Sequence, residues 1–97
     1  MQVGGNYTQT GAGWLRLEIL GDNGVCDQLV ISGIATLSGT LDIALGAGYQ
    51  PGGPNPRTWT PIFYFQGNGQ FTTVNRPPNF AMPFYNPNVA MTITWTP

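Results

Sequence analysis

The residue types that most often perform covalent chemistry are few in this chain. Cys26 is the single cysteine, Ser32 and Ser38 are the two serines, and the sequence contains no histidine. A side-chain nucleophile needs a neighbouring base or a lowered pKa. The sequence therefore predicts no catalytic residue, and it favours a core position for the Cys26 thiol over a reactive one.

The four carboxylates, Glu18, Asp22, Asp27 and Asp42, offer pairs of the kind that glycosidases use. Asp27 and Asp42 stand in apolar, strand-like segments, where a hydrogen bond to the backbone is the simpler role. Asp22, Asn23 and Asp27 could supply oxygen ligands to calcium, but their spacing matches no standard loop and Asn23-Gly24 is a strong turn signal. We predict neither a hydrolase site nor a metal or cofactor site.

Charged residues make up only 7% of the 97 residues, with three Arg, no Lys and a net charge of −1. Neither a nucleic-acid surface nor a polybasic membrane patch can be built from three scattered cations. No apolar run approaches the roughly 20 residues that cross a bilayer. A net charge near zero favours association, so we expect protein partners, either a shell protein or further copies of this chain in a homo-oligomer or large assembly.

Aromatic side chains are plentiful, and they either fill the core or form a protein interface or a sugar platform. The glycine- and proline-rich segment from Gly46 to Arg57 is long for a small domain and is the expected contact loop. The predicted interface residues come from this loop and from the proline-rich, aromatic half after it. They are Tyr49, Gln50, Pro51, Asn55, Arg57, Trp59, Arg76, Phe80, Phe84 and Tyr85.

No segment has helical periodicity, and 14 Gly and nine Pro are scattered along the chain. Residues 1–97 are therefore expected to form a single all-β domain of about eight short strands, either a β-roll or solenoid or a sandwich, with no helix of note. The expected strands are Gln2 to Thr10, Trp14 to Leu20, Cys26 to Ser32, Ile34 to Leu37, Thr40 to Leu45, Thr58 to Phe65, Gln70 to Val74, Phe80 to Tyr85 and Val89 to Trp95. Pro61 predicts an edge or a bulge.

An internal repeat lies in the first half of the chain. The series Gly5, Tyr7, Gln9, Gly11 aligns with Gly33, Ala35, Leu37, Gly39 at an offset of 28 residues. Leu15, Leu17 and Ile19 then align with Leu41, Ile43 and Leu45, with two fewer residues after the corner in the second copy. Two stacked copies would form neighbouring coils of a β-roll, with Gly33 and Gly39 as corners, although two similar hairpins of a sandwich would give the same pattern.

Five segments, GNYTQTGAGWLRLEI, DQLVISGIATLSGTLDIAL, GYQPG, TWTPIFYFQGNGQFTTVN and NVAMTITW, span nearly the whole chain. In this order they resemble a module near the ends of bacterial autotransporter-like passengers and other large surface β-solenoid proteins. The resemblance implies a right-handed β-roll or β-helix ending that builds and caps elongated extracellular proteins, without catalytic residues. Cys26 stands where that pattern often has Tyr, and the second half carries more prolines.

The first residues, MQVGGNYTQT, lack the charged and apolar regions of a signal peptide. Together with the scarcity of charge, this favours a small non-enzymatic decoration or cement protein that stabilises a phage capsid or similar shell and is located in a virion assembled in the host cytoplasm. The alternative, from the resemblance, is a terminal module of a bacterial surface adhesin, located at the cell surface. A third interpretation, from the aromatics alone, is a carbohydrate-binding module.

Overall fold

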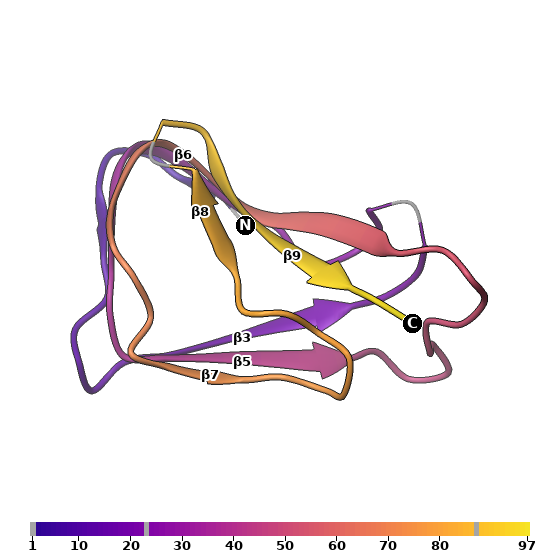
Figure 1. The fold of residues 1–97 in the computed structure, drawn as a ribbon. Coiled ribbons are helices and arrows are strands. Elements are labelled where there is room, and N and C mark those ends of the chain that lie inside the picture. The colour runs from indigo at the N-terminus through magenta and orange to yellow at the C-terminus, as the bar shows by residue number, and fades with distance from the viewer. Residues whose placement is uncertain (1, 23, 87) are drawn as a thin grey trace.

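The computed structural model describes residues 2–22, 24–86 and 88–97, and within them the chain forms nine strands and no helix. The prediction of an all-β fold is confirmed. The strands are β1 (Gln2–Val3), β2 (Tyr7–Thr8), β3 (Trp14–Ile19), β4 (Leu29–Leu37), β5 (Thr40–Leu45), β6 (Arg57–Gly69), β7 (Thr73–Asn75), β8 (Phe84–Asn86) and β9 (Ala90–Trp95) (Figure 1).

The chain winds three times around one core, and each coil contributes to two facing sheets. Coil one (residues 2–19) holds β1, β2 and β3, coil two (29–45) holds β4 and β5, and coil three (57–75) holds β6 and β7. Sheet A has the order β1-β4-β6-β9-β8, with β2 also paired to β4, and sheet B has the order β3-β5-β7. Figure 1 shows the two layers, with the chain passing between them at the corners of the coils.

The coils stack in the register that the internal repeat aligns. Tyr7 pairs with Ala35, and Leu15 pairs with Leu41, in parallel strands. Coil three continues both ladders, since Ala35 also pairs with Gly67. Successive coils therefore run parallel, as in a β-roll, while two packed layers and an antiparallel hairpin are also found in sandwiches.

Gly39 forms the corner of coil two, as expected. Its φ is +73°, and a Cβ there would lie 2.5 Å from the carbonyl oxygen of Gly13. Gly33 is not a corner, because β4 runs through it from Leu29 to Leu37 with only an irregularity between Ile31 and Ile34. A Cβ at Gly33 would lie 2.4 Å from Asn6 Oδ1, so this glycine permits coil one to approach closely.

Coil one is interrupted where one strand from Gln2 to Thr10 was expected. β1 and β2 are separated at Gly4-Gly5, and side chains take over the missing ladder bonds. Gly5 N donates to Ser32 Oγ at 2.8 Å, and Ile34 N donates to Asn6 Oδ1 at 2.9 Å.

Gln9 is a buried polar side chain that joins the corners of coils one and two. Its Oε1 accepts from the Tyr7 hydroxyl at 2.8 Å, while its Nε2 donates to Ser38 O at 2.8 Å and Thr40 O at 3.3 Å. A buried amide with its hydrogen bonds satisfied fixes one relative position of the two coils.

A C-terminal hairpin closes the other end of the stack. β9 pairs antiparallel with β6, and β8 pairs antiparallel with β9. The ladder between β6 and β9 shifts between Trp59 and Ile62, which confirms a bulge at Pro61. Residues 66–69, expected as a turn, instead extend β6, because Gly67 and Gly69 pair with Ala35 and Leu37 of coil two.

The core lies between the inner faces of the two sheets. The alternating apolar residues of β3 and β5 face this core, whereas Val89, at the start of the last expected strand, is exposed although Met91, Ile93 and Trp95 are buried. The buried core comprises Leu17, Ile19, Leu29, Ile31, Ala35, Leu37, Leu41, Ile43, Trp59, Ile62, Tyr64, Phe71, Phe80, Met91, Ile93 and Trp95.

Candidate functional site

The ten predicted interface residues lie in three places. Tyr49, Gln50, Pro51, Asn55, Arg57 and Trp59 belong to the loop before β6 and the start of that strand, Arg76 and Phe80 follow β7, and Phe84 and Tyr85 lie in β8. Pro51, Trp59 and Phe80 are buried, so their side chains are part of the core and do not present a surface to a partner. Gln50, Asn55, Arg76 and Phe84 are exposed, and Tyr49, Arg57 and Tyr85 are half-buried.

Asp22 joins the contact loop to the turn after β3. Its Oδ1 lies 2.9 Å from Arg57 Nε and accepts from the Tyr49 hydroxyl at 2.6 Å. Arg57 also donates to the Gly52 carbonyl oxygen at 2.5 Å. These contacts fix the loop against the body of the protein. The Asn23 part of the predicted turn lies outside the described residues.

Aromatic side chains pack against the contact loop. Trp59 Nε1 donates to Gly21 O at 2.9 Å, and the Trp59 ring meets Tyr49 edge-on at a centroid distance of 6.5 Å. Burial and the neighbouring Asp22 raise the pKa of Tyr49 to about 12. Arg57 Cζ lies 5.6 Å from the centroid of Trp95, a cation–π contact. The cluster holds structure in place and leaves Trp59 and Trp95 no free ring face at the surface.

Two of the candidate nucleophiles, Cys26 and Ser32, are deactivated or engaged. Burial and the charge of Asp27 raise the pKa of the Cys26 thiol to about 11, which keeps it protonated at neutral pH. Ser32 Oγ accepts from Gly5 N at 2.8 Å and donates to Val3 O at 3.4 Å. Ser32 therefore holds the backbone of coil one against coil two.

The carboxylates serve structural roles of the kind expected for Asp27. Asp27 Oδ2 accepts from Glu18 N at 3.0 Å. Arg16 Nη1 lies 3.8 Å from Asp42 Oδ2 across the ladder between β3 and β5, because Arg16 and Asp42 are register partners. Among the described residues, no three His, Cys, Asp or Glu side chains come together as a metal site.

Arg76 is tied to its own segment. Its Nε donates to Phe80 O at 2.7 Å, and Nη1 lies 2.8 Å from Met82 Sδ. The segment lines a surface hollow of about 480 Å³ between Val74 and Phe80. Because Nε and Nη1 of Arg76 contact the segment that follows it, this side chain stabilises the fold.

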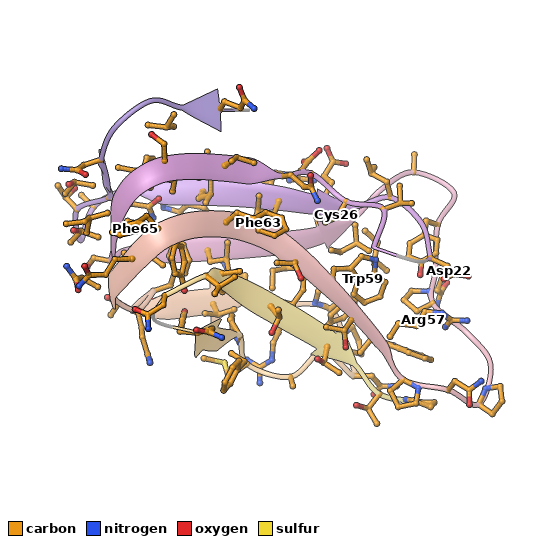
Figure 2. The ribbon with its side chains drawn as sticks, turned by 90° about the horizontal axis from the view of Figure 1, so that it is seen from above. Asp22, Cys26, Arg57, Trp59, Phe63 and Phe65 are labelled. Carbon is orange, nitrogen blue, oxygen red and sulfur yellow. The ribbon has the colours of Figure 1, made fainter. Side chains whose placement is uncertain are left out.

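The outer face of sheet A carries the main exposed aromatic surface. Phe63 pairs with Val30 and with Ala90, on the face opposite the core, and Phe65 follows two residues later. Phe84 pairs with Thr92 on the same face. Phe65 and Phe84 are 71% and 67% exposed. We call the surface of Val30, Phe63, Phe65 and Phe84 the aromatic face. Figure 2 looks onto sheet A and shows Phe63 and Phe65 along β6, away from Asp22 and Arg57.

The two outer faces differ in charge. The outward residues of sheet A, from Gln2 through Val30 and Phe63 to Asn86, are uncharged. On the outer face of sheet B stand Arg16, Glu18 and Asp42. The prediction chose Phe84 but missed Phe63 and Phe65. Phe63 and Phe65 alternate with Ile62 and Tyr64 in the sequence. Because neighbours in a strand point to opposite faces, this alternation indicates that Phe63 and Phe65 point outward when Ile62 and Tyr64 point into the core.

Comparison of the chain with family models, curated proteins and solved structures gives no match. The described residues include no helix of the length and apolarity that a membrane span requires.

Proposed function

We propose that this chain is a non-enzymatic structural protein that docks on a protein shell, in the manner of a small decoration or cement protein on a virus capsid. The aromatic face is the docking surface. The supporting observation is that Phe65 and Phe84, 71% and 67% exposed, stand on a sheet face without charged side chains. Exposed apolar surfaces with few charges are typical of protein interfaces.

The size of the molecule fits this use. Its Cα extents of 38 × 23 × 22 Å give each long side a footprint of roughly 850 Å², close to the ~800 Å² that each partner buries in a standard interface. The rigid support of the sheet behind Phe63 and Phe65 keeps the ordering cost of docking low. In a virion, such a protein would add contacts between shell subunits without catalysing a reaction.

Co-sedimentation with assembled candidate shell protein tests the proposal. The doubly substituted chain Phe65→Ser/Phe84→Ser should lose co-sedimentation, whereas Leu20→Ser/Val25→Ser, which removes exposed apolar side chains elsewhere, should retain it. Circular dichroism checks that both variants keep the fold. Equal binding by the two double variants, or binding by neither variant nor the parent, would exclude the aromatic face as a shell-docking surface.

A second candidate, the terminal module of a bacterial β-solenoid surface protein, is favoured by the parallel stacking of the coils in repeat register. A gene whose reading frame continues upstream into further coils behind a signal peptide would support it. A gene beside that of a major capsid protein would instead support the decoration role. The carbohydrate-binding alternative loses its main support because Trp59 and Trp95 lie in the core, which leaves Trp14 as the one exposed indole.

A further inference from the structure

The edge of sheet B at coil one has hydrogen-bonding groups directed away from the sheet. β3 is the outer strand of sheet B. Gly46 N donates to Ile19 O at 2.7 Å, and Thr40 N donates to Gly13 O at 2.9 Å, so the odd-numbered residues of β3 face β5. The N–H and C=O groups of the even-numbered residues therefore point outward, as alternate residues of an edge strand do.

The C-terminal half of this edge is covered by the chain itself. Glu18 N donates to Asp27 Oδ2 at 3.0 Å, and Asp27 N donates to Glu18 O at 2.9 Å. Leu20 N donates to Val25 O at 2.9 Å. The segment from Val25 to Asp27, which we call the return segment, thus blocks strand pairing beyond residue 17.

The N-terminal half is open. In the described part of the chain no strand lies beside the outward N–H and C=O groups of Trp14 and Arg16. Trp14 is 67% exposed, and the Arg16 side chain is 63% exposed. An unprotected edge with an exposed indole is a site where another strand can pair.

We propose that this open edge binds the same edge of a second copy of this chain, in an antiparallel pair with its two-fold axis at Leu15. Trp14 then stands opposite Arg16 of the second copy, and Arg16 opposite Trp14 of the second copy. Each such pair exchanges two backbone hydrogen bonds, so all the outward groups of both residues are satisfied. On the outer face each guanidinium lies beside an indole, a favourable cation–π arrangement.

The registers displaced toward the C-terminal end of β3 are excluded by the same contacts. An axis at Arg16 places two guanidinium groups against each other and sets Trp14 against Glu18 of the second copy, which Asp27 already covers. An axis at Leu17 sets Arg16 against Glu18 of the second copy and Trp14 against Leu20 of the second copy. The return segment already covers Glu18 and Leu20, so neither pair can form. With the axis at Leu15, the two return segments lie at opposite ends of the joined strands. Sheet B then continues across the axis as six strands.

This dimer is independent of shell docking, since it uses a sheet edge and leaves the aromatic face exposed. The double variant Phe65→Ser/Phe84→Ser should therefore remain dimeric, and failure of the docking proposal would leave the dimer proposal standing.

Sedimentation velocity over a range of concentrations tests the dimer. The parent chain should sediment as a dimer, and Trp14→Ala and Arg16→Ala should each raise the dimer dissociation constant at least about tenfold, because each removes two symmetric contacts. Glu18→Gln, on the same strand and face but at a covered position, should leave the dimer unchanged. A parent that is monomeric up to high concentration, or a dimer insensitive to Trp14 and Arg16, overturns the proposal.

A cross-link locates the axis. In a Cys26→Ser background, Leu15→Cys should form an intermolecular disulfide on mild oxidation, because directly opposed residues of a non-hydrogen-bonded pair have Cα atoms about 4.5 Å apart, within disulfide range. Leu17→Cys should not cross-link, since its partner in this register is Gly13. Equal cross-linking at both positions, or none at Leu15, contradicts this register.

Discussion

Gly39, at the corner of coil two, and Gly48, in the contact loop, provide a matched test of how tightly the coils stack. Gly39 and Gly48 have nearly the same left-handed φ, +73° and +80°, so an alanine at either site incurs the same backbone penalty of about 1–2 kcal/mol. They differ in their surroundings. A Cβ at Gly39 would lie 2.5 Å from Gly13 O and 2.6 Å from Thr10 O, whereas a Cβ at Gly48 has nothing within 4 Å.

The difference between the two variants isolates the contact between coils. Relieving a clash with backbone atoms requires coil one to shift, which adds about 1–3 kcal/mol of overpacking cost. We expect Gly39→Ala to lower the free energy of unfolding by about 2–5 kcal/mol. Gly48→Ala should lower it by only about 1–2 kcal/mol. A loss of 3 kcal/mol is a large part of the 5–15 kcal/mol that holds a typical domain together.

Urea unfolding followed by tryptophan fluorescence measures the difference. With a slope of ~1 kcal/mol/M for a chain of this size, the midpoint for Gly39→Ala should lie about 1–3 M below that for Gly48→Ala. Gly52→Ala, at a position with neither a left-handed φ nor a close neighbour, is the neutral control. Equal midpoints for Gly39→Ala and Gly48→Ala would show that coil one does not press on the corner of coil two as described.

Three further predictions concern single side chains. Cys26, with its pKa raised from 9.0 to about 11, should be alkylated at pH 8 roughly a hundredfold more slowly than in the urea-unfolded chain, and equal rates would contradict its burial. Because folding raises the pKa of Tyr49 from 10.0 to about 12, its stabilising contribution is complete below pH 10 and is lost between pH 10 and pH 12. The free energy of unfolding should therefore fall less between pH 9 and pH 11.5 for Tyr49→Phe than for the parent chain. Gln9→Ala should cost about 1–3 kcal/mol by leaving the Ser38 and Thr40 carbonyls without its donor, whereas Thr8→Ala, at an exposed position, should be neutral in the same urea titration.

The register of coils one and two could be predicted because the sequence contains it twice. Leu15 and Leu41 occupy equivalent places in two copies with the same alternation, so the pairing follows from the alignment. Coil three could not be predicted from the repeat, because the contact loop lengthens the sequence offset between coils two and three and the bulge at Pro61 interrupts the alternation. The local sequence around Gly67 and Gly69 favours a turn, but pairing with coil two holds both residues in β6. Tertiary contacts here override the local preference.

The candidate interface was harder to predict than the fold. Composition identifies aromatic residues but does not say which side of a strand each one occupies when a bulge shifts the alternation. Trp59 lies on one side of the Pro61 bulge and points into the core, while Phe63 and Phe65 lie on the other side and point outward. The partners of Asp22, which are Arg57 and Tyr49, are distant in sequence and came together only in the folded chain.

The direction of β9 closes the stack of coils at one end. Because β9 runs opposite to β6, a fourth coil added after the third would find no parallel neighbour in sheet A. Duplication of a coil can therefore lengthen this architecture only on the far side of β6, among the coils that precede it. The hairpin acts as a stop that makes growth of the structure one-directional, and a chain carrying an extra copy of coil two should gain one strand in each sheet while keeping the same closed end.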